Sequence, residues 1–302
     1  MKNIGIDIGG TFIKAAIVEN TGKIILSSKT PTPKDGASLP EKVVEIIREL
    51  TDKAGVAISD IEHIGMGVPG VCDVKHGRVI SCTNIEGCSN VSICEYVSKQ
   101  TGVPSFIDND ANCAALGEYM MSKTKPNGFV FVTLGTGVGG GIILNGKILR
   151  GINCAAGEIG HIVIDKAGER CNCGRYGCWE RYASVSALVR QTKQAGFTGN
   201  VTGKTVFEER IKGNRLADEV LDTWLRYVAE GICDLVNIFQ PEVVAIGGGI
   251  SREGDIILKP VREFVEKNVV TAPTSLKKTE IKISQLFNDA GVVGASFLYT
   301  QN

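Results

Sequence analysis

The sequence predicts an α/β protein made of two related halves. Each half opens with an apolar strand, a glycine-rich turn and a returning strand, at residues 3–18 and again at residues 128–149. Helix-periodic segments separate the later strands, which is typical of sheets covered by helices. The chain has 302 residues, of which 43% are hydrophobic. It can therefore build a sizeable core and is not a disordered protein.

The first half is expected to begin with an antiparallel meander. Residues 3–8, 12–18 and 23–27 are β-rich runs separated by turn residues. A helix is predicted over residues 39–54, where apolar side chains recur on one face. The later elements of this half are predicted as a strand at 61–68, a helix at 91–101, a strand at 104–107 and an alanine-rich helix at 110–121.

The second half repeats the opening pattern. A strand is predicted at 128–134, a glycine-rich turn at 135–141 and a return strand at 142–149. The elements that follow are a long helix at 216–239, a strand at 243–246 with three glycines after it, and a final helix at 291–300. The expected domains are a smaller lobe of residues 1–107, completed by the C-terminal helix at about 290–302, and a larger lobe of residues 108–289.

Charge and targeting signals narrow the function classes. The 33 Lys and Arg residues balance 33 Asp and Glu residues, which argues against a surface built for nucleic acid or anionic lipid. The N-terminus lacks the apolar segment of a secretory signal, and no run approaches the roughly 18 apolar residues of a membrane-spanning helix. We therefore expect a cytoplasmic protein whose ten cysteines are reduced thiols or metal ligands.

Two glycine-rich turns have the character of phosphate-binding loops. In Asp7-Ile-Gly-Gly-Thr11 the glycines let backbone N–H groups approach a phosphate, and the Thr11 hydroxyl adds a donor. Asp7 would repel phosphate, so its expected role is to hold magnesium. By itself this turn is equally well a hairpin capped by Asp7. The run at 134–141 repeats the Gly-Thr pairing, and together with the glycine triplet at 247–249 it favours a nucleotide clamp.

A histidine and three cysteines have the spacing of a zinc site. Cys171, Cys173 and Cys178 follow a C-x-C-x4-C pattern, and two glycines bend the loop between them. His161 is the natural fourth ligand of a tetrahedral Cys3His site, which would be structural because no position is left for water. The alternative is that these cysteines are buried thiols, as we expect for the other seven, which are scattered among apolar residues.

Acidic and amide side chains gather where a strand is predicted to end and a helix to begin. The run Asp108-Asn-Asp-Ala-Asn112 must supply an N-cap, but two acids and two amides exceed what one cap requires. A carboxylate at this junction can accept a proton from a hydroxyl that attacks a phosphoryl group. Glu158 and Glu180 flank the proposed metal loop. They are placed either to bind vicinal sugar hydroxyls or to be solvated surface acids.

Taken together, these motifs resemble the ROK family of sugar kinases. The resemblance spans nearly the whole chain with family order and spacing, and one departure is Cys88, where the family often carries an aromatic residue. It implies a two-lobed actin/hexokinase-like ATPase (ribonuclease H-like) fold with a structural zinc loop. The motifs that carry it are Asp7-Ile-Gly-Gly-Thr11, Gly67-Val-Pro-Gly70, Asn109-Asp-Ala-Asn112, Leu134-Gly-Thr-Gly-Val-Gly-Gly-Gly141, Ala156-Gly-Glu-Ile-Gly-His161, Cys171-x-Cys-Gly-x-x-Gly-Cys178-x-Glu180 and Gly247-Gly-Gly249.

The resemblance implies an ATP-dependent kinase that phosphorylates the 6-hydroxyl of a hexose, with Asp110 as catalytic base. It also implies a homodimer formed through the larger lobe. The implied sugar ligands are Asn109, Glu158, His161, Glu180, Asn84 and Gly70, with His161 offering one nitrogen to zinc and the other to the sugar. The implied ligands of ATP and its magnesium are Asp7, Gly9, Gly10, Thr11, Lys14, Gly135, Thr136, Gly137, Gly247 and Gly248.

Glucose is the favoured substrate because residues 134–146 and 155–161 most resemble the glucokinase branch of the family. The alternatives are a kinase for N-acetylmannosamine, N-acetylglucosamine, fructose, allose or another hexose, and a non-catalytic sugar-binding scaffold stabilised by zinc. The presence of Asp7, Asp110 and both phosphate-type loops counts against the scaffold. A repressor is not expected either, since the first strand begins at residue 3 and leaves no room for a preceding DNA-binding module.

Overall fold

The computed structural model describes residues 1–82, 84–271, 273–274 and 277–301, and it divides into two compact units. Unit 1 consists of Met1–Lys125, Gly141–Gly157 and Asn288–Asn302, and unit 2 of Pro126–Gly140 and Glu158–Phe287. This division differs from the predicted domains in two segments, because residues 108–125 and 141–157 belong with the N-terminal residues. Asn302, the last residue of the predicted C-terminal segment, lies outside the described residues.

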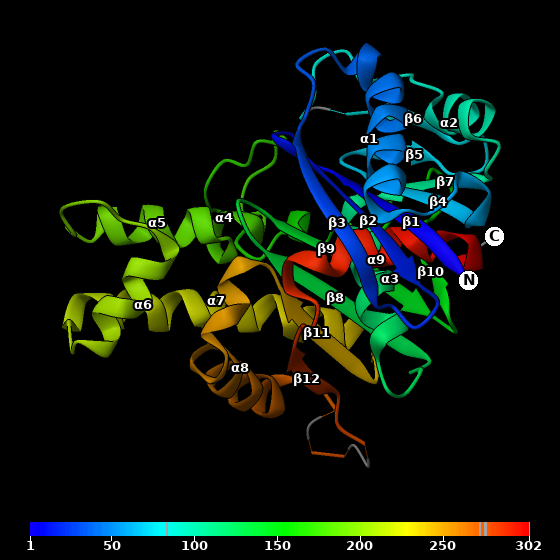
Figure 1. Cartoon of the computed structure of the whole chain (residues 1–302). Helices are drawn as coiled ribbons and strands as arrows, with labels where there is room; N and C mark the ends of the chain where they lie inside the picture. Colours follow the sequence, from blue (N-terminus) through cyan, green and yellow to red (C-terminus); the bar gives the residue numbers. More distant parts are fainter. Residues whose placement is uncertain (83, 272, 275–276, 302) are drawn as a thin grey trace. The chain divides into compact units, whose positions relative to one another are not determined.

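Unit 1 contains a five-stranded sheet in the order β3-β2-β1-β4-β7. Strands β1, β2 and β3 form an antiparallel meander, which confirms the prediction, and β4 and β7 run parallel to β1 (Figure 1). The carboxyl ends of the three parallel strands therefore lie at one edge. The strands are β1 (Lys2–Ile8), β2 (Phe12–Glu19), β3 (Ile24–Pro31), β4 (Ile61–Val68) and β7 (Ser105–Asn109), and a separate hairpin is made by β5 (Val71–Asp73) and β6 (Arg78–Ser81).

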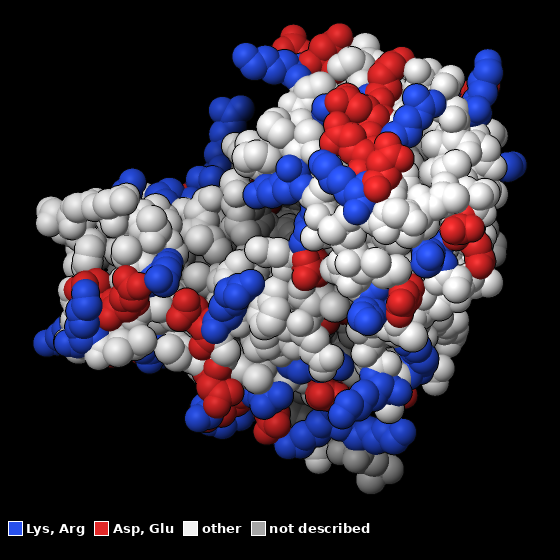
Figure 2. Space-filling model, viewed as in Figure 1, with Lys and Arg blue, Asp and Glu red and all other residues white. Residues whose placement is uncertain are grey.

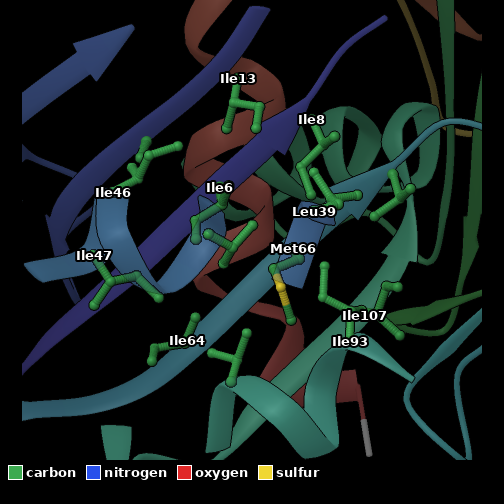
Figure 3. Close-up of a cluster of buried hydrophobic side chains, with 14 of the residues drawn as sticks. Ile6, Ile8, Ile13, Leu39, Ile46, Ile47, Ile64, Met66, Ile93 and Ile107 are labelled. Atoms are coloured by element: carbon green, nitrogen blue, oxygen red, sulfur yellow. The ribbon is translucent and has the colours of Figure 1, made fainter. Parts of the chain in front are cut away.

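The core of unit 1 forms where branched side chains of the sheet meet helix α1 (Leu39–Ala54). Ile6 and Ile64 of the sheet cluster with Ile46 and Ile47 of the helix (Figure 3). Each fully buried isoleucine contributes about 1.5–3 kcal/mol to folding. The predicted bounds of α1 are confirmed, because its apolar positions recur on one face and Gly55 ends it in the left-handed conformation. Helix α2 (Ile93–Thr101) packs beside α1.

Two further helices of unit 1, α3 (Asp110–Met121) and α9 (Ala290–Ser296), pack together, and α9 also packs on the sheet. The backbone of α9 approaches the strands closely. A Cβ on Gly5 would lie 1.8 Å from the Val292 carbonyl oxygen, and one on Gly65 would lie 1.8 Å from that of Ala295. Only glycine permits this approach. The prediction of a helix at 291–300 is confirmed only to Ser296, where α9 ends. The 3-10 helix η6 (Leu298–Gln301) follows it.

Unit 2 contains the parallel strands β8 (Gly128–Leu134), β11 (Val243–Gly247) and β12 (Glu280–Ile283), with β11 between the other two. The prediction of a glycine turn over 135–141 is wrong in its second part, since β9 (Val138–Leu144) already begins at Val138. The segment Gly141–Gly157 belongs to unit 1, where the end of β9 pairs with β10 (Lys147–Ile148) in a hairpin.

Helices make up most of the rest of unit 2. The long helix α7 (Arg215–Phe239) confirms the prediction. The others were not predicted, because α6 has apolar residues on more than one side and α8 contains Pro260, which obscures its pattern. They are α4 (Glu180–Ala183), α5 (Val185–Gln194), α6 (Gly203–Ile211) and α8 (Asp255–Asn268).

The surface carries both signs of charge. On the face shown in Figure 2, basic and acidic side chains are intermixed, in keeping with equal numbers of the two. Among the helices of the described residues, none has the length and apolar character needed to span a bilayer.

Candidate active site

In unit 1, the carboxyl ends of three parallel strands bring acidic residues to one edge of the sheet. The strand register sets Asp7 of β1 opposite Gly67 of β4, and Gly67 opposite Asp108 of β7. Asp110, at the start of α3, is close enough to Asp7 to raise the pKa of its carboxyl. The structure therefore brings together the two carboxylates that the sequence assigned to magnesium and to catalysis.

The turn from β7 into α3 is held by Asn109, which is the N-cap of the helix. Its Oδ1 accepts hydrogen bonds from the N–H groups of Ala111 at 2.8 Å and Asn112 at 3.2 Å. Its Nδ2 donates to the Gly70 carbonyl oxygen at 3.1 Å. Asn109 thus fills the capping role, and it links the helix to the Gly70 loop. This contact joins two of the predicted sugar ligands.

Burial raises the pKa of both carboxyl groups at this edge, those of Asp7 and Asp110. The pKa of Asp7 is raised from 3.8 to about 6, mainly by burial and then by the nearby charge of Asp110, while Lys14 opposes the shift. Burial also raises the pKa of Asp110, against hydrogen bonds from the N–H of Ala111 and the side chain of Asn109. Paired acids with raised pKa values are typical of functional sites.

The predicted ATP ligands of unit 1 lie in the turn after β1, at Gly9, Gly10 and Thr11, and on β2, where Lys14 pairs with Asp7 in the strand register. The Gly9 N–H donates to the Phe12 carbonyl oxygen at 2.9 Å, which closes the turn and leaves Gly10 and Thr11 exposed. A Cβ on Gly10 would lie 3.1 Å from the carbonyl oxygen of Asn84, so this predicted sugar ligand lies beside the turn.

Lys14 has a partner that the sequence did not indicate. Its ammonium forms an ion pair with Asp289, the residue before α9, and also donates to the Asn288 carbonyl oxygen at 3.1 Å. The side chain of Lys14 is only 25% exposed. A bound phosphate would have to compete with Asp289 for this ammonium.

Replacing Asp7 by asparagine should stabilise the protein at alkaline pH. Because the pKa of Asp7 in the folded chain is about 6, above its ordinary value of 3.8, the folded state binds more protons than the unfolded state between these values. Stability therefore falls as pH rises from about 4 to 6, and the loss persists above pH 6. Asp7→Asn removes this loss, so urea unfolding at pH 8 should give a free energy of unfolding about 3 kcal/mol higher than that of wild type.

The gain should shrink as the pH of the unfolding experiment approaches 4. Asp52→Asn, at an exposed position on α1, is the matched control and should leave stability unchanged. An Asp7→Asn protein that is less stable than wild type at pH 8 would contradict the argument.

Unit 2 holds the predicted metal cluster. The Nδ1 of His161 lies 3.7 Å from the Cys171 Sγ, and the sulfurs of Cys173 and Cys178 are 3.6 Å apart. All four ligand atoms lie within 4.8 Å of one another. A zinc–sulfur bond of about 2.3 Å puts two sulfurs of a tetrahedron about 3.8 Å apart, so this donor set fits a zinc ion with a Cys3His shell.

The metal loop carries Glu158 and fixes one face of His161. With Nδ1 turned to the cysteines, the Nε2 of His161 lies 4.0 Å from the Glu158 Oε2. Both side chains are partly exposed, His161 at 34% and Glu158 at 60%. The pair therefore offers one imidazole nitrogen and one carboxylate to a polar ligand.

Glu180 is fixed from two directions. The preceding residue, Trp179, is fully buried, and its indole N–H donates to the Tyr227 carbonyl oxygen of α7 at 2.6 Å. The Oε2 of Glu180 accepts the N–H of Val138 at 3.1 Å. A Cβ on Gly137 would lie 2.2 Å from the same oxygen. Glu180 therefore lies against the second glycine turn, which links a predicted sugar ligand to a predicted phosphate loop.

A cavity of about 630 Å³ in unit 2 lies beside this turn. Gly135 and Thr136 line it, as the nucleotide assignment requires, and so does Gly249. Its other lining residues are Leu134, Val185, Ser186, Val189, Gly203, Lys204, Ile250, Arg252 and Glu253. Of these, Leu134 begins the predicted loop at 134–141, and Ile250, Arg252 and Glu253 closely follow the glycine triplet, whereas the other five had no nearby signal in the sequence.

Gly247 and Gly248 are not among the cavity residues. They let the end of β11 lie close to β8, since a Cβ on Gly247 would be 2.4 Å from the Phe131 ring and one on Gly248 would be 2.1 Å from the Leu134 carbonyl oxygen. The φ of +90° at Gly248 also disfavours any other residue. Their predicted contact with ATP stays a prediction.

Comparison with known proteins gives the same family along the whole chain. The model of the ROK family matches residues 3–302. A glucokinase of Halalkalibacterium halodurans is 36% identical, with 99% of this chain and 94% of that protein covered. The crystal structure of a ROK family glucokinase from Streptomyces griseus, in complex with glucose and AMPPNP, has a TM-score of 0.84 at 32% identity and covers both chains fully. A xylose repressor of Caldicellulosiruptor bescii is 29% identical, over 96% of this chain and 76% of the repressor.

Proposed function

This chain belongs to the ROK family, and we propose that it is a glucokinase, which transfers the γ-phosphoryl group of ATP to the 6-hydroxyl of glucose. The observation that carries the proposal is the pair of partly buried carboxylates, Asp7 and Asp110, at one strand edge of a chain related throughout to glucokinases. One carboxylate suits a metal–nucleotide complex and the other suits a hydroxyl nucleophile.

Asp110 is assigned the role of general base. The glucose 6-hydroxyl attacks the γ-phosphorus, its proton passes to the Asp110 carboxylate, and ADP leaves with the electrons of the broken P–O bond. Asp110 stands in the first turn of α3 next to the cap residue Asn109, so its backbone is rigid. Its raised pKa brings proton affinity closer to that of a useful base at neutral pH.

The sugar hydroxyls are assigned to the six residues that the family motifs imply. In unit 1 these are Asn109 with the Gly70 loop that it contacts, and Asn84. In unit 2 they are Glu158, the Nε2 face of His161, and Glu180. Carboxylates and an imidazole nitrogen accept or donate the short hydrogen bonds by which vicinal hydroxyls are held in place.

ATP is assigned to the two glycine turns and the unit 2 cavity. The cavity is lined by apolar residues such as Val185, Val189 and Ile250 together with charged residues, which suits an adenosine. Gly9, Gly10 and Thr11 offer backbone and hydroxyl donors to phosphate. Asp7 is the residue that would hold magnesium, which neutralises charge on the phosphates when bound.

Zinc is assigned a structural role at His161, Cys171, Cys173 and Cys178. When bound, it would fix the fold of the loop that carries Glu158 and Glu180, and it would hold the His161 ring with Nε2 turned away from the cysteines. The four protein ligands fill a tetrahedral shell, so this ion is not assigned a step in phosphoryl transfer.

Replacing Gly137 by alanine should weaken sugar binding. The new methyl group would displace the Glu180 carboxylate, from which a Cβ at Gly137 would lie only 2.2 Å away, while the backbone there accepts alanine. The expected result is a rise in the KM for glucose of about tenfold. Gly135→Ala is the matched control, because a Cβ there meets nothing within 4 Å. A Gly137→Ala enzyme with unchanged glucose KM would argue against the role of Glu180.

An ADP-release assay tests the function directly. Zinc-loaded protein is given magnesium-ATP with glucose, mannose, fructose, allose, N-acetylmannosamine or N-acetylglucosamine, and the preferred sugar should be glucose. Preference for another sugar would leave the proposed kinase activity intact and change the proposed substrate. If folded protein released no ADP with any of these sugars, the proposed kinase activity would be wrong and a binding scaffold would be favoured.

The proposal includes a cytoplasmic homodimer, which rests on the family resemblance and on the reduced thiols expected from the sequence. Light scattering of the purified protein should give about twice the chain mass of 32.2 kDa. A monomer mass at micromolar concentration would contradict this part of the proposal and leave the chemistry untouched.

A further inference from the structure

We propose that Arg150 is a positioning residue for phosphoryl transfer, which acts by holding Asp108 at the start of helix α3. The inference rests on the proposed function, in which Asn109 binds the sugar and Asp110 accepts its proton. Arg150 follows the β9–β10 hairpin and, like Asp108, belongs to unit 1. It is assigned no contact with substrate.

The Asp108 carboxylate links the guanidinium to the helix start. Its Oδ2 accepts the Arg150 Nε–H at 2.8 Å. Its Oδ1 accepts the backbone N–H of Asn109 at 2.8 Å and the Nδ2 of Asn112 at 2.9 Å. One oxygen thus faces the cation and the other faces Asn109 and Asn112 at the start of α3, so a movement of the carboxylate is transmitted to both.

The two asparagines depend on this carboxylate for their orientation. The Oδ1 of Asn112 has no hydrogen-bond partner among the described residues, so the bond from its Nδ2 to Asp108 is what orients the amide. Asn109 receives its remaining constraints from the helix N–H groups and from Gly70. Asp108 fixes the peptide group from which the Asn109 side chain projects.

Burial makes Asp108 dependent on Arg150. The side chain of Asp108 is 2% exposed and that of Arg150 is 18% exposed. Removing one partner of a buried ion pair leaves an uncompensated charge, which is strongly unfavourable, whereas removing both partners is often tolerated. Without Arg150, the buried Asp108 carboxylate has lost its cation and must turn toward water. That movement disturbs the acceptor that holds the two asparagines.

The position of Arg150 is itself fixed from the C-terminal segment. The Oε1 of Gln301 accepts the Ile148 N–H at 3.0 Å, and its Nε2 donates to the Gly146 carbonyl oxygen at 3.1 Å. The Nη1 of Arg150 lies 3.5 Å from the Gln301 carbonyl oxygen. Gln301 thereby holds the β9–β10 hairpin that precedes Arg150. The guanidinium therefore has little freedom to follow the Asp108 carboxylate if that carboxylate moves.

The test compares Arg150→Met, Asp108→Asn and the double variant. In Arg150→Met the glucose dissociation constant should rise about tenfold and kcat should fall on the order of 100-fold. The KM for ATP should stay within about twofold of wild type, since none of these residues lines the unit 2 cavity. The double variant keeps an amide oxygen for the asparagines and leaves no lone buried charge, so it should lose less than Arg150→Met. Arg150→Lys should recover part of the loss.

Lys147→Met is the matched control. Lys147 lies on the same hairpin, and its Nζ donates to the Thr300 carbonyl oxygen at 3.0 Å, so it also ties the hairpin to the C-terminal segment without touching Asp108. Its glucose dissociation constant and kcat should equal those of wild type. Urea unfolding of every variant ensures that the constants refer to folded protein.

Three outcomes overturn the inference: an Arg150→Met protein with unchanged glucose affinity and kcat, an equal loss toward glucose and ATP, or a double variant at least as impaired as Arg150→Met. Failure of the proposed function is distinct, because it appears in the wild type as absence of turnover with every hexose. In that case calorimetric glucose dissociation constants of the same variants still decide whether Arg150 acts on the sugar side.

Discussion

The Asp110→Asn protein should bind glucose and fail to phosphorylate it. The amide keeps the shape of the carboxyl group and can still pair with the Ala111 N–H, which donates to the Asp110 Oδ1 at 2.9 Å, but it cannot accept the proton of the 6-hydroxyl. General base catalysis contributes about 10²–10⁴-fold, so kcat should fall by that factor. The glucose dissociation constant, measured by calorimetry, should stay within about threefold of wild type because the sugar ligands are unchanged.

Asp73→Asn provides the matched control for this prediction. Asp73 is an acid of the same unit, on β5, and its Oδ2 lies 2.8 Å from the Nδ1 of His76. Its kcat should equal that of wild type. If Asp110→Asn retained full turnover, another group would be the base. If it lost glucose binding in parallel with kcat, Asp110 would be a sugar ligand.

Loss of one metal ligand should destabilise unit 2 more than any ordinary cysteine substitution. Cys178 is fully buried, and burial together with the neighbouring thiols raises the pKa of its own thiol to about 12, so its thiolate needs a cation. In Cys178→Ser the zinc content, measured by plasma mass spectrometry, should fall from one per chain to near zero. The free energy of unfolding should fall by about 4 kcal/mol or more, which lowers the Tm by about 10 °C.

The same substitution at Cys233 separates metal loss from the loss of a buried sulfur. Cys233 lies on α7 of the same unit and is 4% exposed, but it is not part of the cluster. Cys233→Ser should cost about 1 kcal/mol and leave zinc content unchanged. Equal stability of the two variants, with zinc content near zero in both and in the wild type, would show that the cluster holds no metal.

The sequence was sufficient to predict an element or a site wherever the pattern that indicates it lies within neighbouring residues. The bounds of α1 follow from apolar periodicity and from Gly55, which ends the helix. Those of α3 follow from its alanine content and its cap residue Asn109, and those of β8 from a continuous apolar run. The Cys/His cluster could be predicted for the same reason, since Cys171, Cys173 and Cys178 lie within one short loop whose spacing already limits what it can enclose.

The sequence was insufficient where an element is stabilised by distant contacts. Helices α5 and α6 pack on α7, and their own patterns are short. The cavity lining residues Lys204 and Arg252 come from separate elements that only the fold brings together. A window of ten or fifteen residues carries no signal for such contacts, because the free energy that stabilises these helices comes from burial between elements.

The segment 108–112 shows both limits at once. Its composition by itself determined that a cap and a surplus of polar groups stand at a strand end, and the family motif pointed to Asp110. Only the tertiary structure decided what the surplus acid does, because the partner of Asp108 is Arg150, 42 residues away. Likewise Lys14 pairs with Asp289, 275 residues away. The sequence shows which residues carry a charge, but the partner of each charge is set by which strands and hairpins fold against each other. Where the pair is buried, loss of that partner is strongly unfavourable.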